Sequence, residues 1–189
     1  MKVYRTLKVY AKRYEVGDII RFKLTTGEKV ELLAVEQKDD CMQFVFNDCL
    51  MDEYPMNDSY TNEGGYLNSK LRKTLNEEII KLFPKKILKK MRPFPTGDYL
   101  TIPSEKEIFG TNEYGESEPD SVKQWEPMKL RKNRIASQGL NGIYEWYFLR
   151  NRSVQSGSDF AIVYANGVVL NVGASIAGGV RPSLLIYNP

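Results

Sequence analysis

Hydrophobic and polar residues alternate along three stretches near the start of the chain, residues 18–24, 29–36 and 42–47. A period of two is typical of strands with one buried face. Thr26-Gly27 separates the first two stretches as a tight turn would, and residues 37–40 supply a second turn. The pattern predicts an antiparallel β-meander. Its expected inward-facing residues are Ile20, Phe22, Leu24, Val30, Leu32, Phe44 and Phe46.

In the centre of the chain the apolar residues recur every four positions, which predicts a helix with one face in the core. These residues are Leu67, Leu71, Leu75, Ile79 and Phe83. Pro84 stops or kinks this helix before one more expected turn. A helical spacing over residues 3–14 also predicts a short amphipathic helix near the N-terminus.

The stretch after the central helix carries signals for three short elements. Residues 99–102 have the composition of a strand. Ser104 to Glu107 match a capping box, in which the first and last side chains accept each other's backbone N–H groups, so we expect a helix as far as Phe109. Residues 111–127 are polar, acidic and rich in turn formers, which predicts an exposed loop that buries Trp125.

The last part of the chain is rich in β-forming residues, over residues 143–150, 159–165, 168–172 and 180–186. Asn166-Gly167 predicts a hairpin with a type I′ turn, because that turn needs a positive φ at both positions. The elements together predict an α+β fold with mostly antiparallel sheets and central short helices.

A chain of 189 residues has an ordinary length for one domain. We therefore expect a single domain over residues 1–189. Within it, residues 1–62 hold the N-terminal helix and β-meander, residues 63–142 form a helical and loop region, and residues 143–189 form a C-terminal β region.

Composition reduces the number of possible functions. The sequence has no histidine, so the commonest general acid–base and the commonest zinc ligand are missing. Cys41 and Cys49 are expected to be reduced and structural, rather than a disulfide or a catalytic thiol. We therefore expect a protein that is not an enzyme, with no cofactor and no bound metal. Catalysis by carboxylates, lysine or tyrosine is the alternative.

The sequence gives no sign of a membrane protein. No stretch approaches the roughly 18 apolar residues of a membrane span, and the first residues lack the continuous apolar segment of a signal peptide. We expect no membrane contact and a cytoplasmic location.

Charge is unevenly distributed, although the net charge is only +3. Residues 66–95 contain nine basic side chains, and residues 98–120 contain seven acidic ones. Four of the basic residues repeat at i, i+4 and predict a basic ridge on one helix face: Lys85, Lys86, Lys89 and Lys90. This ridge is either a solvated face or a contact for phosphates or an acidic protein. The acidic loop at residues 113–120 is either solvated or a mimic of nucleic-acid phosphates.

The C-terminal segment from Trp146 to Pro182 is the candidate recognition region. Glycines allow close approach of a partner, and tyrosine and asparagine supply adaptable contacts. The candidate binding residues are Tyr164, Asn166, Asn171 and Ser175. Residues 173–179 are alternatively a permissive loop. We expect Trp146 and Arg181 to be framework, with Arg181 buried and holding loops by several hydrogen bonds.

Three segments resemble a family of proteins of unknown function found in phages, prophages and mobile elements of Firmicutes. They are residues 70–76, which contain Leu-Arg-x-x-Leu-Asn, residues 146–152, with Trp-Tyr-x-Leu-Arg-Asn-Arg, and residues 179–182, Gly-Val-Arg-Pro. The C-terminal half also resembles the C-type-lectin-like fold of formylglycine-generating-enzyme relatives. The resemblance implies a lectin-like C-terminal β region, and a protein in the cytoplasm of a bacterial host or associated with a virion.

The departures from that family restrict what the resemblance implies. No cysteine follows Cys49, although formylglycine-generating enzymes use a cysteine pair near the C-terminus. The sugar motifs of calcium-dependent lectins, Trp-Asn-Asp and Glu-Pro-Asn, are also missing. The resemblance therefore implies a shape and a place for recognition, and leaves the ligand open.

Three hypotheses for the function follow. The first is a phage- or mobile-element-encoded binding module that recognises a macromolecular partner, most readily a protein, with nucleic acid as a second possibility through the basic ridge. The second is an intracellular anti-defence protein, such as an anti-CRISPR inhibitor of a Cas9-type nuclease. The third is an enzyme of unknown class.

Overall fold

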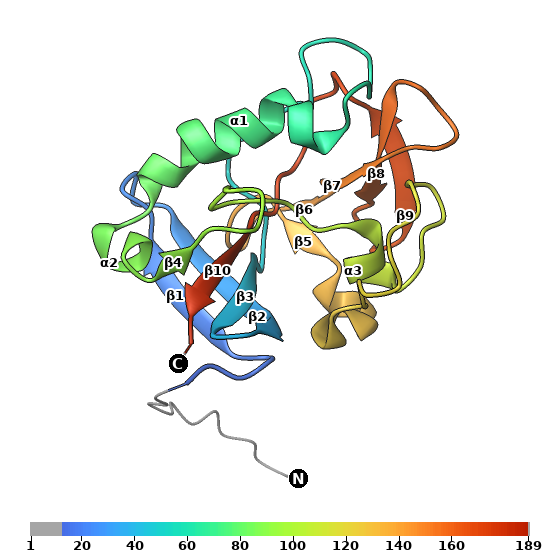
Figure 1. Ribbon diagram of the computed structural model, residues 1–189. Coiled ribbons are helices and arrows are strands. Elements are labelled where there is room, and N and C mark those ends of the chain that lie inside the picture. Colours follow the sequence, from blue (N-terminus) through green and yellow to red (C-terminus); the bar gives the residue numbers. More distant parts are fainter. Residues whose placement is uncertain (1–12, 189) are drawn as a thin grey trace, which may run out of the picture.

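The computed structural model describes residues 13–188 of the chain. The strands form a five-stranded sheet, a three-stranded sheet and a short two-stranded sheet, in which neighbouring strands run antiparallel. Figure 1 shows α1 (Lys70–Glu77) lying across one side of this assembly. The expected α+β fold with mostly antiparallel strands is confirmed. The helix expected over residues 3–14 falls almost wholly outside the described residues, and Tyr14 at its end is not helical.

The predicted meander forms three of the strands of the five-stranded sheet. Its strands are β1 (Ile19–Lys23), β2 (Lys29–Lys38) and β3 (Cys41–Phe46). The C-terminal strand β10 (Ser183–Tyr187) then lies between β3 and the two-residue strand β4 (Met91–Arg92), as Figure 1 shows. All seven predicted inward residues of the meander lie in, or pack against, one apolar core.

The C-terminal strands form the other two sheets. Strands β7 (Tyr147–Arg152), β8 (Asp159–Val163) and β9 (Val169–Gly173) pair in that order. A separate two-stranded sheet pairs β5 (Ala136–Ser137) with β6 (Tyr144–Glu145). The expected β-rich segments are therefore present, with the run at residues 143–150 divided between two sheets.

The hairpin turns between β1 and β2 and between β8 and β9 each use a single left-handed glycine. Gly27 has φ 92° and Gly167 has φ 81°, whereas Asn166 is not among the described residues with positive φ. Each glycine donates its N–H to the carbonyl three residues earlier, Leu24 or Tyr164, at 2.9 and 2.7 Å. This is the three-residue loop built from a type I turn and a left-handed residue. The hairpin at Asn166-Gly167 is confirmed, but the type I′ turn is wrong.

The continuous central helix expected from Leu67 to Phe83 is wrong. A 3₁₀ turn at Tyr66–Asn68 precedes α1, and a second at Ile79–Leu82 follows it. Ser69 starts α1, because its hydroxyl accepts the N–H of Arg72 at 3.1 Å and caps the helix. Leu67 therefore lies before the helix and is 54% exposed, whereas the other four residues of the predicted stripe are buried.

The strand expected at residues 99–102 is also wrong. The Asn76 carboxamide oxygen accepts the backbone N–H groups of Tyr99 and Leu100, at 2.9 and 3.0 Å, and its nitrogen donates to Leu100 O at 2.9 Å. A side chain on α1 therefore satisfies the backbone that a neighbouring strand would have paired. Thr101 alone makes a β-bridge, to Ser183.

The capping box is confirmed. Ser104 Oγ accepts the N–H of Glu107 at 3.2 Å and Glu107 Oε2 accepts the N–H of Ser104 at 2.8 Å, at the start of α3 (Glu105–Phe109). Two 3₁₀ turns, Glu126–Lys129 and Arg131–Asn133, follow the acidic loop. Trp125, just before them, is 2% exposed, so its expected burial is also confirmed.

Two apolar cores share the same strands. One packs α1 against the five-stranded sheet and includes Phe148 and Phe160 from the three-stranded sheet. The other lies on the opposite side of β2 and β3 and contains Trp125, Tyr147 and Leu149. Every residue of β3 is consequently buried.

Candidate functional site

Three hollows share lining residues and lie next to one another, and together they are here called the Arg150 groove. The central hollow has a volume of about 500 Å³ and is lined by residues 64–67, 116–118 and 150–152. It shares Glu116 and Arg152 with a second hollow of about 420 Å³. It shares Tyr66, Leu67 and Arg150 with a third of about 380 Å³. Volumes of this size are typical of ligand sites.

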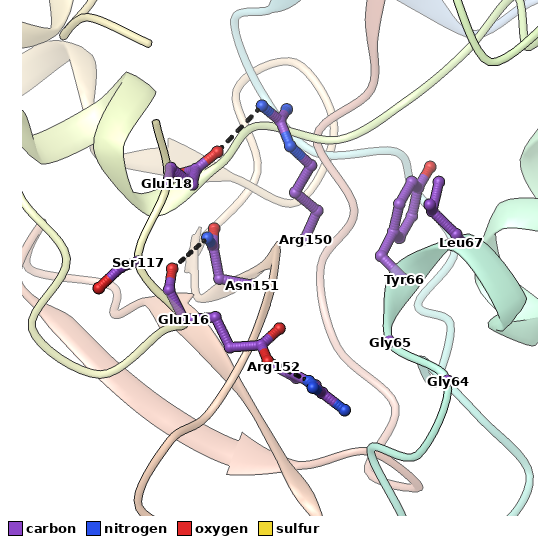
Figure 2. A pocket seen from close by; sticks show the side chains of 10 residues that line it. All are labelled: Gly64, Gly65, Tyr66, Leu67, Glu116, Ser117, Glu118, Arg150, Asn151 and Arg152. Carbon is purple, nitrogen blue, oxygen red and sulfur yellow. Dashed lines mark hydrogen bonds and ion pairs between the residues drawn. The ribbon is translucent and has the colours of Figure 1, made fainter. Parts of the chain in front are cut away.

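The end of β7 forms the floor of the central hollow. The pairing of β7 with β8 shifts between Phe148 and Arg152, which marks a bulge, and bulges re-aim side chains. Arg150 and Arg152 both line the hollow (Figure 2). Asn151 between them is buried and donates to the backbone carbonyl of Glu116 at 3.2 Å.

Arg150 is held by two carboxylates from different segments. Its Nη1 donates to Glu107 Oε2 at 2.8 Å and to the carbonyl of Ile102 at 3.1 Å. Its Nη2 lies 3.4 Å from Glu118 Oε1 (Figure 2). Burial alone would lower the pKa of Arg150, but the attraction and hydrogen bond of Glu107 outweigh burial and raise it. The guanidinium is therefore a fixed positive charge inside the groove.

Glu105 holds the wall formed by the acidic loop. Its side chain is fully buried and accepts the backbone N–H groups of Glu113, Tyr114 and Gly115, at 2.6, 3.1 and 2.6 Å. Three amide donors compensate a buried carboxylate. The loop is also tied to β7, because the N–H of Glu116 donates to Arg152 O at 3.0 Å. The wall is thus anchored at both sides.

Tyr66 and Leu67 form the opposite wall, as Figure 2 shows. Gly64 and Gly65 precede them with φ of 76° and 61°, a left-handed pair that glycine tolerates without strain. The Tyr66 hydroxyl is buried without a hydrogen-bond partner of good geometry, and burial raises its pKa to about 12, although the neighbouring Thr101 side chain lowers that pKa in part. Gln43 Oε1, in the third hollow, is likewise buried and unpartnered. Two unpaired polar atoms therefore belong to residues that line the groove.

The candidate binding residues predicted from the sequence do not line this groove; they lie on the β8–β9 hairpin and the segment after it, where Asn171 contacts the lining residue Ser153. Tyr164 is 45% exposed. Asn166 is exposed at the turn, and its carbonyl accepts Arg131 Nε at 2.8 Å. Asn171 is half-buried and donates to Ser153 Oγ at 3.2 Å, and Ser175 is half-buried.

The glycines of residues 173–179 pack against the chain itself. A Cβ on Gly178 would come within 2.0 Å of the Trp146 ring, and one on Gly173 within 1.9 Å of the Tyr60 ring. Trp146 also packs edge-on against Phe148, with ring centres 5.2 Å apart. The close approach that these glycines allow is therefore made to aromatic rings of the same protein. Trp146 occupies a position suited to a framework residue.

The basic ridge is exposed but less helical than expected. Lys85 and Lys86 begin the four-residue helix α2 (Lys85–Leu88), whereas Lys89 and Lys90 follow its end. All four side chains are exposed, and none lines the Arg150 groove. Pro84 immediately before α2 separates it from the preceding turns.

Sequence patterns did not single out the residues of the groove. Arg150 and Arg152 lie in the segment at residues 146–152 that carries the family resemblance, and Glu118 lies in the acidic loop. The loop and β7 are far apart in sequence, so their ion pairs become visible only when the chain is folded. The capping box at Ser104 was the one local signal near the groove, since it fixes Glu107 beside Arg150.

The thiols are poorly suited to nucleophilic chemistry. Cys41 and Cys49 are free and buried. Burial, together with the hydrogen bond to Asp40, raises the pKa of Cys41 to about 11, and burial raises that of Cys49 as well. Thiolate is the reactive form, so both groups are unreactive near neutral pH.

Residues 13–188 bring together no group of three cysteine, aspartate or glutamate side chains that could hold a metal ion. In the same part of the chain, no helix is long and apolar enough to cross a membrane. Comparison with protein-family models, curated proteins and solved structures found no match.

Proposed function

We propose that this protein is a non-catalytic binding module whose Arg150 groove takes an extended segment of a protein partner. The observation that carries the proposal is the groove itself, three adjoining hollows with fixed charges along the floor and wall. Three hollows side by side suit an extended chain better than a compact small molecule. Tyr66 and Gln43, which line the groove, each also have a buried polar atom without a hydrogen-bond partner.

The chemistry of the groove favours binding over catalysis. Glu107 and Glu118 both pair with Arg150, and Glu116 pairs with Arg152. A general acid or base needs a proton-transfer site free to meet the substrate. The carboxylates are instead occupied by arginines, and the pKa of the Tyr66 hydroxyl is moved away from neutrality.

Charges of both signs along the groove favour a protein over a nucleic acid. Arg150 and Arg152 each have a carboxylate partner at the groove surface. A phosphate backbone would meet Glu116 and Glu118 and be repelled, because nucleic-acid binding relies on uncompensated basic groups. A polypeptide with mixed polar and apolar side chains meets no such penalty.

The biological setting completes the proposal. We place the protein in the cytoplasm of a bacterial host or on a virion, encoded by a phage or mobile element, on the basis of the sequence resemblance alone. An inhibitor of a Cas9-type nuclease is the alternative. Its argument from acidic mimicry is weakened, because Glu116, Glu118 and Asp120 are all paired with basic side chains of the same protein.

The test is capture of a partner from bacterial lysate on the immobilised protein, with identification by mass spectrometry. Ser117→Trp adds a large ring at the rim of the central hollow and should weaken or abolish capture. Ser121→Trp adds the same ring to an exposed position of the same loop and should leave capture intact.

Two further variants ask whether another surface is responsible. One replaces Tyr164, Asn166 and Asn171 with alanine, and the other reverses the four ridge charges. If either of these loses the partner while Ser117→Trp retains it, the groove is not the binding site. A retained Cas9-type nuclease, inhibited in a cleavage assay, would support the alternative.

A further inference from the structure

The outer edge of β9 has no paired strand among residues 13–188. Within the described part of the chain, β9 pairs with β8 and with no other strand. The hairpin closes on a hydrogen bond from Tyr164 N–H to Val168 O, 2.8 Å long. Hydrogen-bonded and non-hydrogen-bonded pairs alternate along an antiparallel pair of strands. Counting from Val168, the backbone N–H and C=O groups of the even-numbered residues of β9 point toward β8. The backbone N–H and C=O groups of Val169 and Asn171 therefore point outward.

This edge lacks the features that usually protect strand edges from pairing. Exposed edges typically carry charged residues or proline, or are very short. The edges of the five-stranded sheet conform, because β1 contains Arg21 and Lys23 and β4 has two residues, one of them Arg92. The sequence of β9 is Val-Leu-Asn-Val-Gly, which contains neither a charge nor a proline. The edges of the five-stranded sheet are thus protected while the edge of β9 is not, which indicates that another strand pairs with β9.

Exposed apolar side chains surround the same edge. Leu170 on the strand is 36% exposed, and Val168 at the turn is 37% exposed. Tyr164 and Ile176, at either end of the hairpin, are 45% and 48% exposed. Such a group of apolar side chains is typical of a protein contact.

The edge is self-complementary about Asn171. If two copies of β9 pair antiparallel with Asn171 opposite Asn171, Val169 lies opposite Gly173 and Leu170 opposite Val172. The odd-numbered residues then form the hydrogen-bonded pairs. Asn171 pairs with its own copy through backbone groups left free among residues 13–188, whereas the Gly173 carbonyl opposite Val169 also accepts the N–H of Ile176, at 3.1 Å. The strand contains no charged residue, so this pairing brings no like charges together. It is also the one antiparallel register in which all five residues of β9 pair with the five residues of the second copy.

The charges beside the strand also match in this register. Arg131 lies at the turn end, where it binds Asn166 O. Asp159 lies at the other end of the hairpin, on β8 opposite Gly173. Its side chain points to the same face of the sheet as that of Ala161. The two-fold axis places the basic end of each copy against the acidic end of the other.

We propose that two copies of this protein pair through β9 about a two-fold axis at Asn171, joining their three-stranded sheets into one six-stranded sheet. The backbone hydrogen bonds supply the pairing, and Leu170, Val172 and Val169 supply the buried apolar contact. A two-fold interface of this kind closes on itself and stops at a dimer. The proposal is independent of the Arg150 groove, because no residue of β9 lines it.

The test is sedimentation velocity over a concentration series, with circular dichroism to verify folding. Wild-type protein should sediment with twice the mass of one chain. Asn171→Asp and Asn171→Lys each place like charges across the axis and should each give monomers. Mixing the two variants should restore a dimer, because Asp then faces Lys. Arg21→Asp, on the edge strand of the other sheet, should leave the dimer unchanged.

Three results would overturn the proposal: wild-type monomers at every concentration, a dimer that survives both charged variants, or a mixture that stays monomeric. A second measurement needs no variant. Hydrogen exchange of the Val169 and Asn171 amides should slow as protein concentration rises, while exchange at Arg21 stays constant. Equal rates at all concentrations would also refute the pairing.

Discussion

Arg181 and Tyr147 face one another in the interior, with Arg181 Nη1 3.1 Å from the Tyr147 hydroxyl and the guanidinium carbon 5.3 Å from the ring centre. The same nitrogen donates to Asn133 O at 3.0 Å, and Nε donates to Phe46 O. Arg181 is fully buried and so connects β3, β7 and the 3₁₀ turn at Arg131–Asn133. This is the role expected of it as a framework arginine.

Replacing Arg181 with lysine should lower the free energy of unfolding by about 2–4 kcal/mol. A lysine ammonium cannot reach all three acceptors, so buried carbonyls lose their donors. Urea denaturation followed by fluorescence measures the change. Arg131→Lys, at an exposed site, is the control and should cost less than about 0.5 kcal/mol. Equal effects of the two substitutions would contradict the buried role of Arg181.

Gly178→Ala should destabilise the protein by about 1–3 kcal/mol, because the added methyl group overlaps the Trp146 ring. Gly157→Ala makes the same change where no atom lies within 4 Å and should be nearly neutral. Thermal unfolding compares the two, and tryptophan fluorescence reports the displacement of Trp146. If both variants melt at the wild-type temperature, Trp146 does not pack tightly on this glycine.

The meander and Arg181 could be predicted from a single sequence, whereas the groove could not. Period-two alternation predicted the meander and its inward face, because burial on one side of a strand leaves a local pattern. Arg181 between Val180 and Pro182 was likewise recognisable from its apolar neighbours. Such features depend on residues close together in the chain.

Other features depend on partners that are distant in sequence. The strand expected at residues 99–102 fails because Asn76, on a different element, takes the backbone N–H groups. The central helix starts late because the Ser69 cap outweighs the continuing apolar spacing at Leu67. The groove forms where the acidic loop folds onto β7, and no periodicity encodes that contact.

Glu105→Gln should loosen the acidic loop. The carboxamide replaces one carboxylate oxygen with an NH₂ donor, so it cannot accept hydrogen bonds from all three backbone amides. The expected cost is about 1–3 kcal/mol. Hydrogen exchange at the amides of residues 113–115 should become faster. Glu113→Gln alters a side chain that is exposed in the same loop and should leave these amides protected. Unchanged exchange in Glu105→Gln would show that the carboxylate does not hold the loop.

Alkaline pH should destabilise the protein through Cys41. Burial, then the Asp40 hydrogen bond, raises the pKa of this thiol from 9.0 to about 11. The unfolded chain ionises first, so the stabilising contribution is complete below pH 9 and is lost between pH 9 and about 11.

Unfolding free energies from urea titrations across this range measure the effect. Cys41→Ala should decline less steeply than wild-type protein, with the remaining slope contributed by Cys49 and, above pH 10, by Tyr66. Identical slopes for the two proteins would mean that Cys41 ionises equally well in the folded and unfolded states.

Strand β10 lies inside the five-stranded sheet, between β3 and β4, and yet it is the last of the five strands to be synthesised, with Gln43 and Ser183 in contact across 140 positions. On the ribosome, the meander therefore emerges with the edge of β3 open, and it stays open while more than half of the chain is translated. Such an edge invites pairing with other nascent chains. Translation that stalls before Ser183 should consequently yield a product recognised by chaperones and proteases, whereas the finished chain closes its own sheet.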